Sequence, residues 1–213
     1  MEDLETWLAR VYQADGKRDT LDTLYDEWAR DYDQQLWASG NPYIAIATGM
    51  TGKWVQDYDA RILDAGCGSG NMAQVLHQMG YDNIEGLDPS PGMLAVARGK
   101  GVYRQLHQLY LDSRVDLPDA SFDAVVAAGV LTHGHAPPES LDGILRLTRA
   151  DGVIVFSLSK IAWDDHGFRD KIEQLETDGQ WQRLDQSRLF RTYPFSEQEA
   201  HLRHWVMAFR KTG

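Results

Sequence analysis

Three glycines at alternating positions follow a short apolar segment, and they are the most informative chemical feature of the chain. Gly66, Gly68 and Gly70 come directly after the segment at residues 61–65. Glycine adopts positive φ angles and lets a ligand approach the backbone closely. A turn of this kind at the carboxyl end of a first strand marks the binding crevice of a doubly wound α/β sheet. The spacing therefore indicates a site for a nucleotide-like cofactor.

The turn is compatible with two classes of cofactor. A dinucleotide site has the pattern G-x-G-x-x-G, whose third small residue would stand at position 71. That position holds Asn71, and the third glycine comes one residue earlier. Asp64 places a carboxylate at the end of the strand, which suits the ammonium group of a methionine moiety better than a pyrophosphate. The pattern favours a methionine-derived cofactor over NAD, with a tight turn that binds no ligand as a further alternative.

A second acidic residue supports the same site. Asp88 ends the segment at 83–88, about 20 residues after the turn, where an acid reaches ribose hydroxyls. A carboxylate accepts hydrogen bonds from both hydroxyls at once. Pro89 and Met93 follow in the next helical segment, and Met93 either packs on an adenine ring or belongs to the core. Cys67, inside the turn, is predicted to be a small residue packed beneath the cofactor.

The elements that position these residues alternate between strand and helix. Strands are predicted at residues 61–65, 83–88, 102–111, 122–128 and 152–159, and helices at 70–79, 91–99 and 138–149. Alternation of this kind predicts parallel strands joined by helical crossovers. The continuous apolar runs at 124–128 and 153–156 are typical of central strands that are buried on both faces.

The two ends of the chain extend this alternating region. Residues 1–57 are predicted to form a helical cap or lid, including a helix at 43–56. A helix at 166–178 precedes two runs, 181–192 and 201–210, which are predicted to be an antiparallel pair; a helix is the alternative for the last run. We expect an α/β protein with a three-layer, doubly wound, Rossmann-like sheet of seven strands, mostly parallel with an antiparallel C-terminal edge hairpin. The domain that contains this sheet would span residues 58–213.

The composition excludes several classes of partner. The net charge of −11 gives a surface that repels a phosphate backbone, so no nucleic-acid partner is expected. No apolar run approaches the roughly 20 residues that span a bilayer, and the acidic N-terminus lacks a signal sequence, so no membrane partner is expected. The single cysteine, Cys67, excludes an internal disulfide and fits a reducing cytoplasm. A monomer or a homodimer is expected.

Four segments together resemble the class I S-adenosylmethionine-dependent methyltransferases, in that family's order and spacing. They lie at residues 62–70, 86–94, 117–125 and 149–153. The N-terminal segment at 25–33 and the C-terminal tail resemble a narrower subgroup, the Williams-Beuren syndrome chromosome-region methyltransferase-like proteins. The resemblance implies S-adenosyl-L-methionine as the cofactor.

The resemblance also implies roles for the residues that match the family's motifs. Asp64 would face the methionine end of the cofactor. The backbone of the glycine turn would touch the cofactor, and Asp88 would hold the ribose. Ala128 and Gly129, at the end of the fourth predicted strand, would lie near the sulfonium.

The resemblance implies cofactor contacts at four further positions, and each of these has an alternative interpretation. Asp112, with the backbone of Ser113, stands where the family usually meets the adenine amino group, although this segment departs from the usual pattern and Asp116 is the alternative acid. Tyr25 and Tyr32 resemble N-terminal tyrosines that cap the cofactor in related small-molecule enzymes. As an alternative, both tyrosines belong to an amphipathic helix face packed on the sheet.

A sulfonium methyl group is already activated, so the protein needs no nucleophile of its own. It must hold the acceptor in line with the methyl group, about 3 Å away, and exclude water. His133 is a candidate base because histidine titrates near physiological pH; the alternative is a structural histidine in a tight loop. The substrate pocket is predicted from aromatic and histidine residues beyond the fourth and fifth strands: His133, Trp163, His166, Phe168, Tyr193 and Phe195. No metal site is predicted.

The sequence therefore predicts an S-adenosylmethionine-dependent methyltransferase that acts on a small-molecule acceptor by in-line displacement. The alternatives are a protein methyltransferase, a module that binds the cofactor without turnover, and an NAD-dependent oxidoreductase, which Asp64 and Asn71 disfavour. We expect the loops around 130–135, 160–168 and 193–195 to determine the acceptor.

Overall fold

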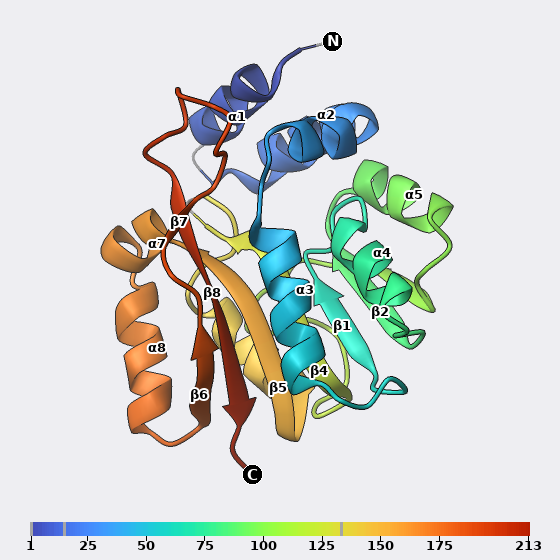
Figure 1. Cartoon of the computed structure of the whole chain (residues 1–213), viewed down its shortest axis with the longest axis vertical. Helices are drawn as coiled ribbons and strands as arrows, with labels where there is room; N and C mark the ends of the chain where they lie inside the picture. The colour runs from blue at the N-terminus through green and yellow to red at the C-terminus, as the bar shows by residue number, and fades with distance from the viewer. Residues whose placement is uncertain (1, 15, 133) are drawn as a thin grey trace.

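The computed structural model describes residues 2–14, 16–132 and 134–213 and has helices on both faces of one sheet (Figure 1). The helices are α1 (Leu4–Gln13), α2 (Arg18–Ala38), α3 (Tyr43–Trp54), α4 (Asn71–Gln78), α5 (Pro91–Gly99), α6 (Ser140–Leu147), α7 (Lys160–Asp165) and α8 (Phe168–Thr177). The strands are β1 (Ile62–Ala65), β2 (Ile84–Asp88), β3 (Gln105–Gln108), β4 (Phe122–Leu131), β5 (Thr148–Ser159), β6 (Trp181–Gln186), β7 (Phe190–Arg191) and β8 (Arg203–Lys211).

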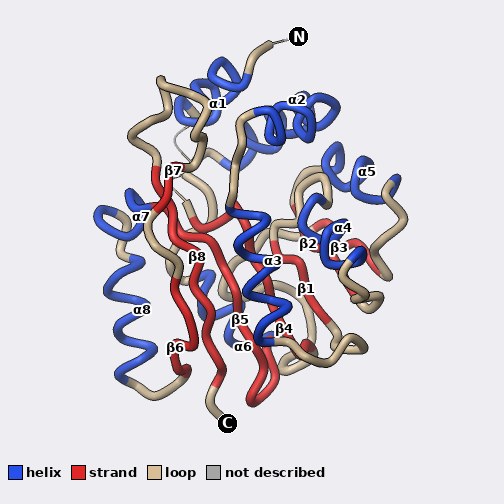
Figure 2. The backbone as a smooth tube through the Cα atoms, viewed as in Figure 1, coloured by secondary structure: helices blue, strands red, loops and turns tan. Residues whose placement is uncertain are grey.

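The strands form one eight-stranded sheet in the order β3-β2-β1-β4-β5-β8-β6, with β7 paired to β8 beside that path (Figure 2). Strands β1 to β5 run parallel, and β8 runs antiparallel to β5 and β6. The winding direction reverses between β1 and β4, which is the switch point at which doubly wound sheets bind ligands. The predicted mostly parallel sheet with an antiparallel C-terminal edge is confirmed, and the last run is a strand.

The strand predicted at 181–192 is interrupted, which is why eight strands replace the predicted seven. The Ser187 Oγ accepts a hydrogen bond from the Val206 amide at 2.9 Å, while the Ser187 amide donates to the Val206 carbonyl at 2.9 Å. A side chain therefore replaces a backbone carbonyl at one rung of the ladder. Regular pairing stops at Gln186 and resumes only for the two residues of β7.

The helix predicted at 166–178 is present as α8, and a short helix that was not predicted, α7, precedes it. Helix α7 begins directly at the end of β5, where the Ser159 Oγ accepts a hydrogen bond from the Ala162 amide at 3.0 Å. Gly167 then has a φ of +77°, a left-handed conformation that breaks a regular helix, and α8 begins at the next residue. Gly167 thus separates α7 from α8.

Alternation along the strands divides the core into two faces. In β4, Ala124 and Val126 belong to one buried cluster, whereas Val125 and Ala127 belong to the other. The first cluster continues into α1, α2, α3 and α4, and the second continues into α6, α7 and α8. Because successive side chains of a strand point to opposite faces, central strands with both faces covered read as continuous apolar runs.

The first two helices lie above the carboxyl ends of the parallel strands, whereas α3 lies along one face of the sheet (Figure 1). Helix α2 packs against α1 and α5, and α3 packs against β4, β5 and β8. The segment before β1 thus supplies both a cover over the switch point and one helix of a sandwich layer. In the described part of the chain, no helix has the length and apolar character needed to cross a membrane.

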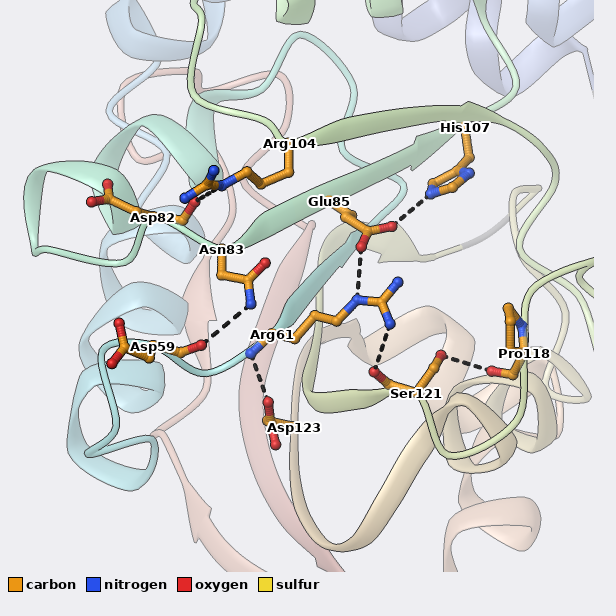
Figure 3. Close-up of polar contacts among 10 residues, drawn as sticks. All are labelled: Asp59, Arg61, Asp82, Asn83, Glu85, Arg104, His107, Pro118, Ser121 and Asp123. Atoms are coloured by element: carbon orange, nitrogen blue, oxygen red, sulfur yellow. Dashed lines mark hydrogen bonds and ion pairs between the residues drawn. The ribbon is translucent and has the colours of Figure 1, made fainter.

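A buried carboxylate ties the first three strands together (Figure 3). Glu85 in β2 accepts hydrogen bonds from Arg61 Nε at 2.7 Å and from His107 Nε2 at 2.8 Å. Burial raises the pKa of Glu85, but the bonds from Arg61 and His107 outweigh burial and leave the pKa below its usual value. Both partners lie outside the glycine turn, so this group supports the sheet that carries the turn.

Candidate functional site

The glycine turn between β1 and α4 has the left-handed backbone that its sequence predicts. Gly66 and Gly68 have φ angles of +73° and +51°. The Gly66 amide donates to the Leu87 carbonyl at 2.7 Å, and the Gly68 amide donates to Asp88 Oδ2 at 2.8 Å. A Cβ atom built on Gly68 would meet no protein atom within 4 Å. The turn is therefore held against the end of β2 and leaves its own face open to a ligand.

A cavity of about 380 Å³ lies over this turn at the switch point. Nine residues predicted to bind the cofactor line it: Tyr25, Tyr32, Gly66, Gly68, Asp88, Pro89, Met93, Ala128 and Gly129. They come from α2, from the turns after β1 and β2, from α5 and from the end of β4. Elements far apart in the sequence thus meet at the carboxyl edge of the sheet, as the topology requires.

Asp88 is the buried carboxylate of the cavity. Its Oδ2 accepts from the Gly68 amide, and its Oδ1 accepts from the Ser90 amide at 3.0 Å. Each carboxylate oxygen has a second lone pair, so the group can still accept from a ligand hydroxyl. Burial raises the pKa of Asp88 to about 6, with the two amide bonds opposing that rise. Asp88 is thus ionised above about pH 6 and is an acceptor for paired hydroxyl groups.

The structure does not bring the predicted pair Asp112 and Ser113 into this cavity. Asp112 accepts a hydrogen bond from the Arg114 amide at 2.8 Å, which closes a local turn, and it lies 3.9 Å from Arg18 Nη2. The cavity is lined instead by the preceding residues, Tyr110 and Leu111. Because β3 ends at Gln108, earlier than the predicted residue 111, the backbone turns away before Asp112 reaches the ligand space.

Asp64 and Cys67 line a side cavity of about 40 Å³, which shares Gly66 and Gly68 with the large cavity. Asp64 is 1% exposed and accepts a hydrogen bond from the Tyr103 hydroxyl at 2.8 Å. Burial raises the pKa of Asp64 to about 7, and the Tyr103 bond opposes that rise. A small buried space that ends on a carboxylate suits an ammonium group, as the sequence predicts.

Gly70 has a packing role and does not line the large cavity. It has a φ of +89° at the N-cap of α4, and a Cβ there would lie 2.9 Å from the Tyr103 ring. The third glycine of the turn therefore allows Tyr103 to approach the backbone. That approach places the Tyr103 hydroxyl on Asp64, so Gly70 acts on the site through its neighbours.

A second cavity, of about 220 Å³, adjoins the first one at the end of β4. Four residues line both cavities: Tyr25, Tyr32, Gly129 and His135. Gly129 has a φ of +82°, and a Cβ there would lie 2.8 Å from the Tyr43 hydroxyl. The glycine thus leaves the passage between the cavities free of a side chain and lets Tyr43 approach.

The predicted substrate pocket is only partly assembled. Tyr193 lines the second cavity, whereas Trp163, His166, Phe168 and Phe195 line neither cavity. Phe168 is buried with α6 and β5 residues in the core, and Phe195 is 78% exposed. These aromatic residues lie on α7 and α8 or beyond β7, away from the junction. His133, the predicted base, lies outside the described residues.

The second cavity contains aromatic residues that the sequence pattern assigned to the core or passed over. Tyr12 on α1, Trp28 on α2 and Tyr43 at the start of α3 line it, together with His201 and His204 near β8. Their helical spacing is that of an amphipathic face, and no local signal separates a face that covers a cavity from one that covers a sheet. These residues are recognised as cavity-lining only in the folded structure, where the N-terminal helices meet the C-terminal segment.

The covering helix α2 is bonded to the loops of the large cavity. Asp26 Oδ1 accepts from the Ser90 Oγ at 2.5 Å and from the Gly92 amide at 2.8 Å, at the N-terminus of α5. Asp33 accepts from Asn71 Nδ2 at 2.8 Å, at the start of α4, and also from the Ser69 hydroxyl. The helix is therefore attached to both turns that surround Asp88.

These features fit a nucleoside-containing cofactor. The large cavity lies within the roughly 300–1,000 Å³ typical of small-molecule sites. It combines the open face of Gly68, an ionisable acceptor for ribose hydroxyls in Asp88, and apolar walls at Met93 and Leu111. The fold and the site thus define a protein that binds such a cofactor at the switch point of a doubly wound sheet.

Comparison with known proteins identifies the class. Residues 63–156 match the family described as "Methyltransferase domain". Human methyltransferase-like protein 27 is 31% identical over 185 residues, which cover 83% of this chain and 75% of that protein. Malonyl-[acyl-carrier protein] O-methyltransferase of Serratia marcescens is 38% identical over 98 residues, which are 46% of this chain and 37% of that protein.

A solved structure shows the same fold. The 1,6-didemethyltoxoflavin-N1-methyltransferase of Burkholderia thailandensis, solved with 1,6-didemethyltoxoflavin and S-adenosylhomocysteine, has a TM-score of 0.63 and is 20% identical, and the match covers 92% of this chain and 90% of that one. The chain belongs to the class I S-adenosylmethionine-dependent methyltransferases, and S-adenosylmethionine is its cofactor. Within that class, the match to methyltransferase-like protein 27 extends over most of both chains.

Proposed function

We propose that this protein transfers a methyl group to a small-molecule acceptor that binds in the second cavity. One observation supports this function most directly: the two cavities meet at Gly129, with Tyr25, Tyr32 and His135 lining both. The second cavity, of about 220 Å³, is smaller than the roughly 300–1,000 Å³ of sites for drug-sized ligands. Its size favours a small molecule over a nucleic acid or a folded protein surface.

In this proposal the chain's own residues bind, orient and exclude water. The cofactor supplies an activated methyl group when it is bound. Asp88 would accept hydrogen bonds from the ribose hydroxyls of the cofactor, and Asp64 would attract the ammonium group of its methionine moiety. Gly129 keeps the junction free of a side chain, so the acceptor can approach the methyl group in line. Tyr25 and Tyr32 cover the junction and exclude water from the reacting atoms.

We further propose that α1 and α2 act as a lid over a catalytic domain at residues 58–213. The bonds of Asp26 to the start of α5 and of Asp33 to the start of α4 support a closed arrangement. Because Tyr25 and Tyr32 on the same helix line both cavities, opening of α2 would expose the cofactor site and the acceptor site together. Such a motion would gate both binding and product release.

Calorimetric titration tests the cofactor part of this function. We expect S-adenosylmethionine and S-adenosylhomocysteine to bind and NAD not to bind. Tight NAD binding without a response to S-adenosylhomocysteine would overturn the proposal. Incubation with cell metabolite extracts and isotopically labelled cofactor, analysed by mass spectrometry, then tests the acceptor. A labelled product in the small-molecule fraction supports the proposal, and label found only in protein contradicts it.

A cytoplasmic location and a monomeric or homodimeric state stay predictions from the sequence. The first rests on the single cysteine, Cys67, which fits a reducing compartment. Light scattering coupled to size-exclusion chromatography measures the second directly. A larger assembly would contradict it.

A further inference from the structure

The walls of the second cavity indicate the chemistry of its ligand. Six aromatic residues line it: Tyr12, Tyr25, Trp28, Tyr32, Tyr43 and Tyr193. They come from α1, α2, the start of α3 and the segment before β8, which converge above the carboxyl edge of the sheet (Figure 1). Of the described residues that line this cavity, none is lysine or arginine. An anionic ligand would therefore find no permanent positive charge on these walls.

A carboxylate stands behind the aromatic walls. The Tyr12 hydroxyl donates to Glu199 Oε2 at 3.4 Å, and Glu199 is only 7% exposed. The faces of tyrosine and tryptophan rings attract a cation, and the attraction grows when the cation leaves water. A nearby buried carboxylate adds to that attraction and repels an anion. The cavity thus selects by charge as well as by size.

Several polar groups on the walls are weak bases, although His135 and His201 also line the cavity. Burial lowers the pKa of His204 to about 4, and its Nδ1 lies 2.6 Å from the Thr192 hydroxyl. Burial also raises the pKa of all five tyrosines above the usual value, so they stay neutral at physiological pH. Neither kind of group removes a proton from an alcohol efficiently, because a general base works best with a pKa near the working pH.

An amine does not need a strong base. Burial of an ammonium ion favours its neutral form, which is itself a nucleophile. Neutral tyrosine hydroxyls, such as that of Tyr43 beside Gly129, can accept hydrogen bonds from its N–H groups. The size of the cavity and the charge around its walls therefore favour an amine as the acceptor.

We propose that the second cavity binds a small organic amine, held against the tyrosine and tryptophan faces near Glu199, as the methyl acceptor. This inference rests on the proposed function of the same site. The amine enters as an ammonium ion and releases one proton to water. Its nitrogen lone pair forms the new C–N bond as the C–S bond breaks, and the electrons of the C–S bond stay on sulfur. The products are an N-methylated ammonium ion and S-adenosylhomocysteine.

Binding to the protein saturated with S-adenosylhomocysteine tests this class. The probes are three size-matched sets, built on phenyl, cyclohexyl and propyl groups, each containing an ethylamine, an ethanol and an acetate derivative. We expect the amine to bind about tenfold or more tightly than the carboxylate in at least one set, a difference of about 1.4 kcal/mol. Absence of an amine preference in all three sets overturns the inference. Failure of S-adenosylhomocysteine to bind would instead contradict the proposed function.

A pair of variants separates the charge of Glu199 from a general effect on the surface. Glu199→Gln keeps a hydrogen-bond acceptor for Tyr12 but removes the negative charge. We expect it to weaken amine binding about threefold or more while the alcohol binds within about twofold of its original affinity. Glu197→Gln is the control, because Glu197 is 88% exposed at its side chain. Equal loss for amine and alcohol, or an unchanged amine affinity in Glu199→Gln, overturns the inference; unaltered affinity for S-adenosylhomocysteine shows that each variant is folded.

Discussion

The Tyr25 hydroxyl lies 2.7 Å from Nε2 of His135, across 110 residues of sequence. Tyr25 belongs to α2, and His135 belongs to the loop after β4. Both residues line both cavities, so the bond closes the space above the junction. It joins the covering helix to the loop that follows β4. Helix α2 therefore supplies part of the wall of both cavities.

Removal of this bond should loosen α2. A hydrogen bond contributes about 0.5–1.5 kcal/mol net, so Tyr25→Phe should make amide exchange in α2 roughly 2- to 12-fold faster. Hydrogen exchange measured by mass spectrometry checks this. Tyr58→Phe is the control, because Tyr58 is 59% exposed and lies before β1. Unchanged exchange across α2 in Tyr25→Phe would show that the bond does not hold the helix.

Asp88→Ala should weaken binding of S-adenosylhomocysteine by more than about tenfold, because hydrogen bonds to a charged group contribute about 1.5–3 kcal/mol each. Calorimetry measures the affinity, and circular dichroism checks the fold, since Asp88 also accepts from the Gly68 and Ser90 amides. Asp112→Ala is the matched control and should bind within about twofold of the original affinity, because Asp112 does not line the cavity. A large loss of affinity in Asp112→Ala would instead show that Asp112 contributes to cofactor binding.

Gly68→Val should abolish cofactor binding while the protein still folds. The new side chain meets no protein atom near its Cβ and so extends into the ligand space. Left-handed backbone strain at a φ of +51° accompanies the change, and it costs on the order of 1–3 kcal/mol of stability. Gly101→Val carries the same kind of strain at a φ of +68°, also with open space around its Cβ, but far from the cavity. Equal losses of binding in both variants would mean that strain, rather than occupied volume, is responsible.

Asp64 should make stability depend on pH. Its pKa is about 7 in the folded state and near 3.8 in the unfolded chain, so between these values only the folded state holds the proton. Stability therefore falls as the pH rises through this window, by up to roughly 1.4 kcal/mol per pH unit. Relative to Asp64→Asn, the cofactor-free wild type should lose unfolding free energy from pH 5 to 7 and then level off. Urea unfolding measures both proteins, and parallel curves over the whole range would contradict a raised pKa.

Local sequence patterns were sufficient to predict much of the fold. The turn at 64–70 needs positive φ angles that favour glycine, and Asp88 follows from the crossover length between neighbouring parallel strands. The strand predicted at 181–192 was wrong in its extent because of a single contact. Ser187 replaces a rung of the ladder beside Val206, where the regular pairing of the strand predicted at 181–192 stops. Such breaks depend on which partner lies opposite, which a periodic pattern does not contain.

The candidate site shows the same division. The residues next to the glycine turn were predictable because each lies at a fixed step from the end of a strand. Asp112 was misplaced by the early end of β3, and Phe195 was grouped with the pocket although its side chain is mostly exposed. A sequence position after a strand says which edge of the sheet a residue reaches. It does not say whether its side chain points toward the ligand space.

The sequence by itself determined the cofactor class, because glycine spacing and strand-end carboxylates are local and follow directly from backbone geometry. Only the tertiary structure decided which residues surround the second cavity. Tyr12 on α1, Tyr43 on α3 and Tyr193 before β8 are brought to one cavity by folding of the two chain ends over the sheet. Their contact depends on long-range packing of apolar surface, which no spacing along the chain encodes.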